Sequence, residues 1–383
     1  MKVVVAPNAL KGSLASVQAA KAMAAGVLGV LPGCEVVQKP VADGGDGLID
    51  VLGEVMGGER TKTGVADPLG QRVEAEYLYL PAEKTAIIEM ARASGLALLA
   101  PGELDPLKTS SVGTGELARH AIERGAKKLI VGIGGSAAND GGMGFAAALG
   151  AKFLDRDGRE LDPTGGNLSR VVRIDPSGIP ESVRGVAIEA MCDVDNPLCG
   201  ERGAAVVYGP QKGATPEMVG RLDAGLGNLA RRIRENLGKE VRDLPGAGAA
   251  GGLGAGLYAF FAATLRPGVD VVMDLVRLDE ALAGADLAFT AEGAIDCQTA
   301  FGKGPAGVAG RAKKAGVPCI ALAGLVAPNI DNLFAIGLDA AFSLCPGPMP
   351  LEKAMTDAPS LLKNAAAMVF RTFLAGRKGC EPT

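Results

Sequence analysis

Apolar residues along the chain follow two alternating patterns. Short apolar runs such as Val3–Ala6 are typical of buried strands, whereas Val17, Ala20 and Val27 recur at the spacing of one helix face. Strands that alternate with helices favour an α/β fold with a largely parallel sheet. We therefore predict an α/β protein.

The pattern changes after Gly57 and Gly58. The apolar residues that follow alternate with polar ones, as in a half-exposed strand of a mixed sheet, at Val73, Ala75, Tyr77 and Tyr79. The first pattern returns late, in strands at Leu287–Thr290, Cys319–Ala323 and Ala340–Leu344 and helices at Pro305–Ala315 and Leu351–Ala375. We predict a discontinuous parallel-sheet domain of residues 1–60 and 285–383, with an inserted α/β domain of residues 61–284 that contains a mixed sheet.

Charge and cysteine content argue against several classes of partner and site. The net charge is −4 and no dense run of Lys and Arg occurs, so we expect neither nucleic acid nor an anionic membrane as partner. The uncharged stretch Pro245–Leu265 contains six glycines, which favours a loop and a buried helix from about Ala255 over a membrane span. Seven cysteines without a C-x-x-C pair indicate a reducing compartment, and we expect the cytoplasm.

The apolar run Leu129–Ile133 leads directly into a glycine-rich loop. Gly134, Gly135 and Ser136 leave backbone N–H groups that can face an anion, which indicates a phosphate-binding turn. An ordinary strand-to-helix turn that needs glycines for tight packing is the alternative. The loop is not a P-loop, because the pattern G-x-x-x-x-G-K-[ST] is absent.

The same loop also satisfies the dinucleotide fingerprint G-x-G-x-x-A. Gly132, Gly134 and Ala137 occupy its fixed positions, and Asp155 and Asp157 follow about 20 residues later. This match predicts a dehydrogenase that uses NAD. Against it, residues 139–142 are Asn-Asp-Gly-Gly, which would break the helix that must begin at the fingerprint.

Acidic and amide side chains gather in four loops that follow predicted strands. These residues are Asp43 and Asp46; Asn139 and Asp140; Asp193, Asp195 and Asn196; and Glu292 with Asp296. Each alone can be a turn or a helix cap. Because open α/β sheets bind ligands where their strands end, we expect the four loops to converge on one sheet edge. Carboxylates that lie close to one another and to a phosphate repel, so we predict that Mg²⁺ binds between them.

Four cationic side chains lie in Gly- or Pro-rich loops instead of on a periodic helix face. They are Lys11, Lys212, Arg266 and Lys303. A cation held by such a loop can contact a phosphate or a substrate carboxylate. An exposed loop cation without a partner is the alternative for each.

The chain has one histidine, His120, within a predicted helix at Gly115–Arg124. We expect a structural role for it, because nothing in the sequence places it near a nucleophile or metal ligands. General-base catalysis then falls to a carboxylate. A single Asp that accepts a substrate hydroxyl proton is the arrangement used in phosphoryl transfer to an alcohol.

These loops match a known family in order and spacing along nearly the whole chain. The matching segments are Ala6–Leu14, Ala42–Gly47, Ser111–Glu116, Gly134–Gly142, Cys192–Gly200, Gly209–Gly213, Pro245–Gly254, Leu265–Gly268 and Glu292–Thr299. With them the chain resembles glycerate kinase of the bacterial two-domain type, the glycerate 2-kinase family. The resemblance implies a flavodoxin-like (Rossmann-like) domain, an inserted second α/β domain, and an active site in the cleft between them.

The resemblance also implies the reaction. The γ-phosphate of ATP would pass, with Mg²⁺, to a hydroxyl of D-glycerate, most often the 2-hydroxyl, to give 2-phosphoglycerate and ADP. Glycerate and ATP are then the expected partners, and the chain is expected to be a monomer or a homodimer.

The resemblance implies roles for the residues at positions that match the family's motifs. The implied catalytic residues are Asp193 as general base, Lys11, Asp43 and Asp296. The implied substrate-binding residues are Lys11 and Arg266, at the glycerate carboxylate, and Asn196. Those implied for the nucleotide are Gly134, Gly135, Ser136, Asn139, Lys212 and Lys303. Those implied for the metal are Asp140, Asp193, Glu292 and Asp296.

The chain departs from the family pattern in its first and late loops. Residues 8–10 are Asn-Ala-Leu where Asp-Ser-Phe is usual, Ala294 replaces an Arg, and Phe301 replaces a His. Loss of an Arg removes a bidentate donor for a carboxylate or phosphate, so the acceptor can differ. The alternatives are therefore a glycerate 3-kinase, a kinase of another small hydroxy acid, the NAD-dependent dehydrogenase, and a nucleotide sensor without catalysis.

Overall fold

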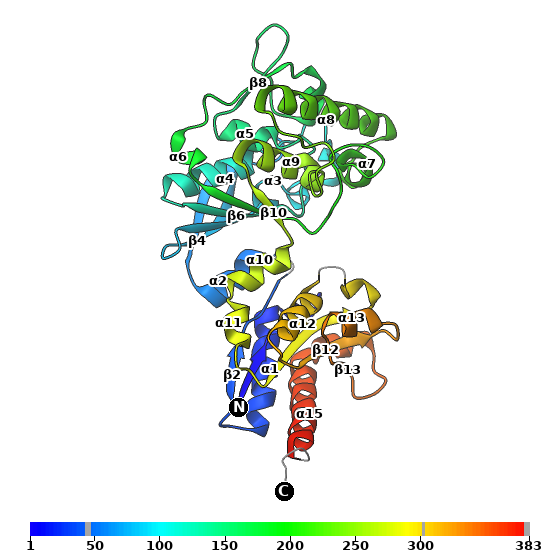
Figure 1. Cartoon of the computed structure of the whole chain (residues 1–383). Helices are drawn as coiled ribbons and strands as arrows, with labels where there is room; N and C mark the ends of the chain where they lie inside the picture. The colour runs from blue at the N-terminus through cyan, green and yellow to red at the C-terminus, as the bar shows by residue number, and fades with distance from the viewer. Residues whose placement is uncertain (43–46, 301–302, 379–383) are drawn as a thin grey trace. The chain divides into compact units, whose positions relative to one another are not determined.

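The computed structural model describes residues 1–42, 47–300 and 303–378 (Figure 1). The chain divides into two compact units. The first comprises Met1–Asp43, Asp50–Met56 and Val269–Thr383, and the second Gly44–Ile49 and Gly57–Gly268. The expected boundary at residue 285 therefore lies after two short helices that belong to the first unit.

The first unit is built on a five-stranded parallel sheet with the order β13-β12-β11-β1-β2. Its strands are β1 (Lys2–Val5), β2 (Glu35–Gln38), β11 (Leu287–Ile295), β12 (Cys319–Val326) and β13 (Ala340–Ser343). In chain order within this unit the arrangement is 2-1-3-4-5, which is the flavodoxin-like order. The side chains of Val3, Val4 and Val5 are all fully buried, as expected for a parallel strand covered on both faces.

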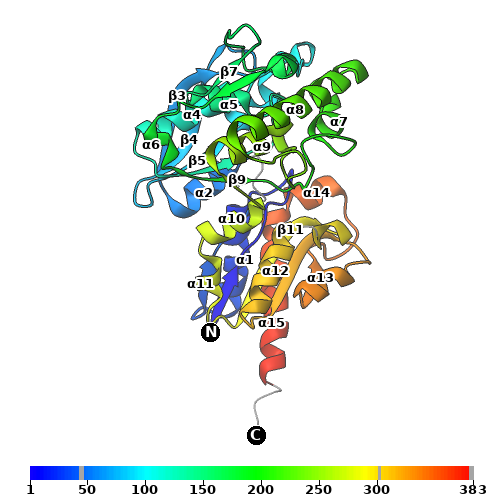
Figure 2. The ribbon, with the colours of Figure 1, turned by 45° about the horizontal axis from the view of Figure 1, so that its top comes forward.

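Helices α1 (Ser16–Val30), α12 (Gly304–Lys314) and α15 (Ala358–Lys378) pack against this sheet. The other helices with most of their residues in this unit are α2 (Leu48–Met56), α10 (Gly268–Leu275), α11 (Leu278–Leu282), α13 (Asp331–Ile336) and α14 (Leu351–Thr356), with a 3₁₀ turn η5 (Cys297–Ala300). Helices α1 and α15 lie side by side (Figures 1 and 2) and share an apolar core with β1 and β11.

The second unit is built on a six-stranded mixed sheet with the order β10-β9-β6-β5-β4-β3. Its strands are β3 (Glu59–Ala66), β4 (Arg72–Leu80), β5 (Thr85–Glu89), β6 (Lys128–Gly132), β9 (Ala187–Met191) and β10 (Thr264–Arg266). Strands β5, β6, β9 and β10 run parallel, and β3 and β4 are antiparallel to their neighbours. The predicted α/β class, with one parallel and one mixed sheet, is therefore confirmed.

The remaining elements of the second unit surround this sheet. They are a small antiparallel pair, β7 (Lys152–Leu154) and β8 (Arg173–Asp175), and the helices α3 (Ala91–Ser94), α4 (Val112–Glu123), α5 (Met143–Ala148), α6 (Glu181–Arg184), α7 (Ala204–Tyr208), α8 (Pro216–Leu237) and α9 (Ala249–Phe261). Short 3₁₀ turns are η1 (Leu96–Leu98), η2 (Pro101–Glu103), η3 (Gly165–Arg170) and η4 (Pro210–Lys212).

Two predicted elements differ from those observed. The late helix at Leu351–Ala375 is two helices, α14 and α15, separated at Asp357. Pro359 explains the break, because proline has no N–H to donate and is favoured in the first turn of a new helix. The half-exposed strand expected around Tyr77 is buried on both faces in its second half, since Leu78 and Leu80 are also buried, with Gly58 packed against them.

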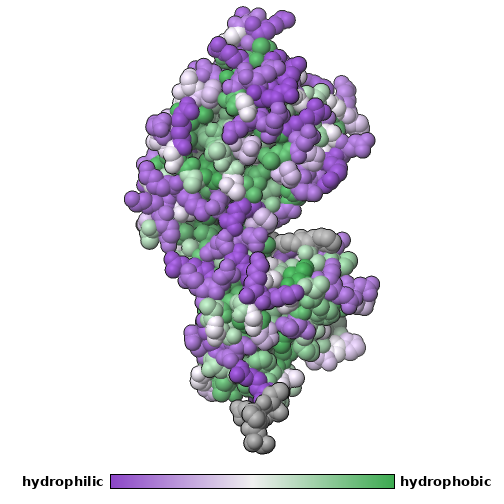
Figure 3. Space-filling model, viewed as in Figure 1, coloured by the Kyte–Doolittle hydropathy of each residue, from purple (hydrophilic) through white to green (hydrophobic). Residues whose placement is uncertain are grey.

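Among the described residues, none of the helices combines the length and apolar content that spanning a bilayer requires. Figure 3 shows hydrophilic residues spread over the visible face of both units, with hydrophobic residues between them.

The contact between α1 and α15 depends on a small residue at position 26. A Cβ atom at Gly26 would lie 2.3 Å from the backbone oxygen of Lys363, whereas one at Gly29 would meet no atom within 4 Å. Gly26→Ala should therefore lower the free energy of unfolding by about 1–3 kcal/mol through overpacking. Gly29→Ala, in the same helix, should raise it by up to about 1 kcal/mol through helix propensity. Urea denaturation measures both, and a Gly26→Ala variant as stable as the wild type would contradict the close packing.

Candidate active site

A cavity of about 210 Å³ lies in the second unit, and it gathers several of the predicted site residues. Its polar lining comes from Gly134, Gly135, Ser136, Asp193, Tyr208 and Lys212. Strands β5, β6 and β9 pair in register, so Glu89, Gly132 and Met191 lie next to one another at the carboxyl edge of the sheet. The loops after β6 and β9 therefore leave this edge together, as predicted for ligand-binding loops of a parallel sheet.

The glycine-rich loop after β6 is held against the segment that follows α3. The amide of Leu96 donates to the oxygen of Gly135 at 2.9 Å, and the amide of Ala137 donates to the oxygen of Ser94 at 2.9 Å. Gly135 has a φ of 71°, a conformation that a residue with a Cβ rarely adopts. Backbone pairing and a glycine together thus fix the course of this loop.

Lys212 is buried beneath the loop, with 2% of its surface exposed. Its Nζ donates to Ser136 Oγ at 3.0 Å and to the oxygen of Ala138 at 2.6 Å. Burial lowers the pKa of Lys212 to about 7, although the carboxylate of Asp140 opposes the change. Lys212 therefore connects the loop to η4, and its pKa lies near neutral pH.

Asp140 is fully buried, and its oxygens are occupied by donors from the protein. They accept from the amide of Ser111 at 2.7 Å, from Ser111 Oγ at 2.8 Å, and from the amides of Gly142 and Gly144 at 2.9 and 3.2 Å. Burial raises the pKa of Asp140, while these hydrogen bonds oppose the rise. The geometry favours a structural role in joining the loop to α4 over the metal role that the sequence suggested.

Asn139, by contrast, is fully buried and has no hydrogen-bond partner for either amide atom within the part of the chain that the structure describes. A buried amide without partners costs about 1–3 kcal/mol for each unmade hydrogen bond. Such a group calls for a water molecule or a ligand. Asn139 therefore stays a predicted ligand-binding residue.

The loop after β9 provides an exposed carboxylate. Asp193 lines the cavity, and its Oδ1 accepts from the amide of Gly268 at 2.7 Å. Arg266, at the end of β10, is half-buried and places its guanidinium 3.5 Å from Glu189 Oε2. Strand pairing continues past β9, since the amide of Cys192 donates to the oxygen of Arg266 at 2.8 Å.

The side-chain amide of Asn196, predicted to contact substrate, is used within the protein. Its Oδ1 accepts from the hydroxyl of Tyr208 at 2.6 Å, and its Nδ2 donates to the oxygen of Arg202 at 2.8 Å. Asn196 thus positions Tyr208, which itself lines the cavity. The sequence did not point to Tyr208, because a lone tyrosine outside any motif carries no signal of its own.

The first unit holds the other predicted residues. A larger cavity of about 660 Å³ there is lined by Lys11, Glu292 and Lys303 together with apolar side chains. Asp296 lies close by in sequence and opens η5, where its Oδ1 accepts from the amides of Gln298 and Thr299 at 2.9 and 3.1 Å. Asp43, Asp46 and Phe301 lie outside the described residues.

The expectation that four acidic loops converge on one sheet edge is wrong. The loops after β6 and β9 follow strands of the six-stranded sheet, whereas Glu292 lies in β11 of the five-stranded sheet. The polar loops therefore divide between two sheets, one in each unit. In residues 1–42, 47–300 and 303–378, no three His, Cys, Asp or Glu side chains come together as a metal-holding group.

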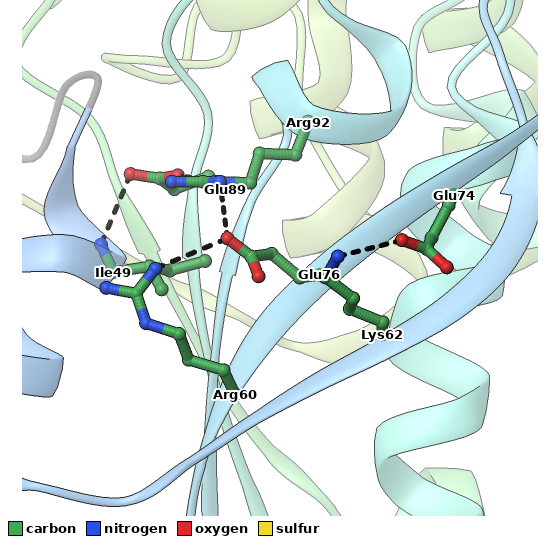
Figure 4. Close-up of polar contacts among 7 residues, drawn as sticks. All are labelled: Ile49, Arg60, Lys62, Glu74, Glu76, Glu89 and Arg92. Atoms are coloured by element: carbon green, nitrogen blue, oxygen red, sulfur yellow. Dashed lines mark hydrogen bonds and ion pairs between the residues drawn. The ribbon is translucent and has the colours of Figure 1, made fainter.

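A buried carboxylate at the edge of the second sheet escaped the sequence analysis. Glu89, at the end of β5, accepts from the amide of Ile49 at 3.3 Å and pairs with Arg92 (Figure 4). Arg92 also pairs with Glu76 at 2.6 Å, and Arg60 lies 3.4 Å from Glu76. In the sequence, the only indication of Glu89 was a glutamate at the end of a short apolar run.

His120 lies in α4, and its Nδ1 and the Tyr77 hydroxyl are 2.9 Å apart. This contact fits the structural role expected of His120.

The pKa of Lys212 predicts how stability depends on pH. An unfolded chain has an ordinary lysine pKa of about 10.4, whereas burial lowers that of Lys212 to about 7 in the folded protein. Between these values the unfolded state binds more protons, so Lys212 makes the free energy of unfolding rise with pH. Below pH 7 both states are protonated and the cost of burying the charge is fully present.

Lys212→Met should therefore flatten the rise in unfolding free energy between pH 7 and 9, by up to about 1.4 kcal/mol per pH unit. Urea denaturation at pH 6, 7, 8 and 9 measures the slope. Lys127→Met serves as control, because Lys127 is exposed and should keep the wild-type slope. An unchanged slope in Lys212→Met would show that Lys212 titrates as an ordinary lysine.

Comparison with known proteins places the whole chain in one family. The model of the glycerate kinase family matches residues 3–374. A glycerate kinase of Halalkalibacterium halodurans is 48% identical over 364 residues, which cover 95% of this chain and 96% of the relative. The glycerate 2-kinase of Escherichia coli K12 is 41% identical over 378 residues, 99% of each chain. A crystal structure assigned to glycerate kinase 2 of Salmonella typhimurium LT2 has a TM-score of 0.90 and 45% identity, and the match covers 99% of both chains. The chain therefore belongs to the glycerate kinase family.

Proposed function

We propose that the protein transfers the γ-phosphate of ATP, with Mg²⁺, to the 2-hydroxyl of D-glycerate and so forms 2-phosphoglycerate and ADP. Family membership and the relative named glycerate 2-kinase support the reaction and its regiochemistry. The observation that carries the proposal is the cavity in which an exposed carboxylate, Asp193, and a buried lysine, Lys212, accompany a glycine-rich loop. Phosphoryl transfer requires positioning and charge stabilisation more than covalent chemistry, and these groups provide both.

Each residue has a distinct part in this proposal. Asp193 accepts the proton of the attacking hydroxyl as general base. Lys212 and the backbone amides of Gly134 and Gly135 stabilise negative charge that develops on the phosphoryl oxygens. Arg266 binds the carboxylate of the acceptor through its planar guanidinium.

The donor set of the first unit fits Mg²⁺. This ion keeps several of its waters and is bound by one or two carboxylates together with substrate phosphates, so it needs no group of three protein carboxylates. Glu292 and Asp296 would hold it. When bound, Mg²⁺ neutralises charge on the phosphates of the nucleotide. We leave Asp140 out of this set, because hydrogen bonds from Ser111, Gly142 and Gly144 already occupy its oxygens.

The structure disfavours one of the alternative functions. A dehydrogenase is not favoured, because the segment after Gly132 forms a loop and the next helix, α5, begins only at Met143. A glycerate 3-kinase, or a kinase of another small hydroxy acid, keeps the same site and changes the acceptor. The cytoplasmic location and the monomeric or homodimeric state remain predictions.

The reaction is tested by incubating the enzyme with ATP, Mg²⁺ and D-glycerate, measuring ADP release and identifying the product by ³¹P NMR against both phosphoglycerate isomers. We expect stoichiometric ADP and a 2-phosphoglycerate signal. A 3-phosphoglycerate signal would establish the other regiochemistry. ADP without either isomer would mean ATP hydrolysis or another acceptor.

Asp193→Asn tests the general base. It should lower kcat about 10²- to 10⁴-fold while nucleotide affinity stays near the wild-type value. Asp195→Asn, from the same loop, is the matched control, because Asp195 is 75% exposed and pairs with Arg202. Asp296→Asn should instead raise the Mg²⁺ concentration needed for half-maximal rate. Normal turnover of Asp193→Asn at saturating glycerate would remove Asp193 from this role.

A further inference from the structure

Resting on the proposed function, we infer that the cavity of the first unit is the nucleotide site, where the apolar wall receives the adenine base and Lys11 and Lys303 receive the phosphates. The cavity is described entirely by residues of that unit.

The first observation is where the cavity lies in the five-stranded sheet. In the order β13-β12-β11-β1-β2, strands β1 and β11 are neighbours. The chain continues from β1 to β2 on one side of this pair, and from β11 to β12 and β13 on the other side. Open α/β sheets bind ligands at such a switch point, outside the carboxyl ends of the strands. Lys11 follows β1 and Glu292 lies in the second half of β11, and both line the cavity.

Size is the second observation. Cavities that enclose drug-sized ligands measure about 300–1,000 Å³. The cavity of the first unit, about 660 Å³, falls within this range. The cavity of the second unit, about 210 Å³, falls below it and suits a small acid better than a nucleotide.

The lining is the third observation, because it combines an apolar wall with cations. The apolar wall consists of Leu325, Leu344, Met349, Leu351, Met355 and Leu361. Leu325 and Leu351 are 60% and 74% exposed, which is unusual for large apolar side chains gathered at one cavity. A flat apolar base would cover such a surface and take it out of water.

The cations complete the match to a nucleotide. Lys303 is the residue that immediately precedes α12, an 11-residue helix with no acidic side chain in its first turn. The amino end of a helix favours anions, and a lysine beside it adds a full positive charge. Lys11 is exposed in the loop after β1. An apolar base joined to a polyanion is the ligand that an apolar wall and two lysines complement.

Two cysteines allow the site to be tested directly in the intact enzyme. Cys345 lines the cavity of the first unit and Cys192 that of the second, and both are half-buried. Iodoacetamide labelling followed by peptide mass spectrometry gives the rate at each thiol, with and without Mg²⁺ and ADP. We expect ADP to slow labelling of Cys345 at least about tenfold and that of Cys192 less than twofold. Protection of Cys192 with Cys345 unprotected would overturn the inference.

A substitution on the apolar wall gives an independent measurement. Leu325→Asp should raise the Kd for ADP, measured by titration calorimetry with Mg²⁺, at least about tenfold, because it places a charge where the base would lie. Its high exposure keeps the fold intact. Met368→Asp is the matched control, since Met368 in α15 is 64% exposed and does not line the cavity, and its Kd should match the wild type. An unchanged Kd in Leu325→Asp would overturn the inference.

Failure of the inference and failure of the proposed function give different results. A D-glycerate kinase whose Cys345 is not protected by ADP keeps the function and places the nucleotide elsewhere. Protection of Cys345 by ADP in a protein that does not phosphorylate D-glycerate keeps the nucleotide site and changes the acceptor.

Discussion

The hydrogen bonds received by the Asp140 carboxylate hold the second unit's loops in place. One side chain joins three pieces of backbone: the start of α4 at Ser111, the turn at Gly142, and the start of α5 at Gly144. Ser111 extends the connection, since its Oγ accepts from the amide of Phe145 while donating to Asp140. The glycine-rich loop that lines the cavity is the segment that ends at this anchor, so its position depends on a side chain that no solvent reaches.

Lys212 provides a second point of attachment for the same loop. Burial lowers the pKa of Lys212, and the Asp140 carboxylate opposes part of this change. Lys212 in turn holds Ser136 and Ala138. The loop is therefore held at Ser136 and Ala138 by Lys212 and at Asp140 by backbone amides, and Gly134 and Gly135, which precede these points, line the cavity. Rigid donors around an open space are what stabilisation of a developing charge needs.

The sequence predicted the elements well and the partners of individual side chains poorly. The strands containing Val3, Leu129, Leu287 and Cys319 could be predicted because each is a short apolar run. The same reasoning could not show that Asp140 and Glu292 belong to different sheets, Asp140 in the loop after β6 and Glu292 within β11, since strand order is a tertiary property. It also could not distinguish Asp140 from Asp193. Both are aspartates in loops after strands, and only packing decides that the first is enclosed by amides and the second is exposed.

The insertion of one unit within the other has a consequence for the order of events during synthesis. Strands β3 to β10 of the second unit come from one continuous stretch, so its sheets can form as soon as that stretch has left the ribosome. The first unit cannot do this, because β1 must pair with β11, which is made near the end of the chain. Strand β1 (Lys2–Val5) can pair early with β2, but it lacks β11, and helix α1 lacks α15, throughout the synthesis of the second unit. The early part of the chain is thus the part that waits longest for its native neighbours, and during that wait it is the part most exposed to aggregation and to binding by chaperones.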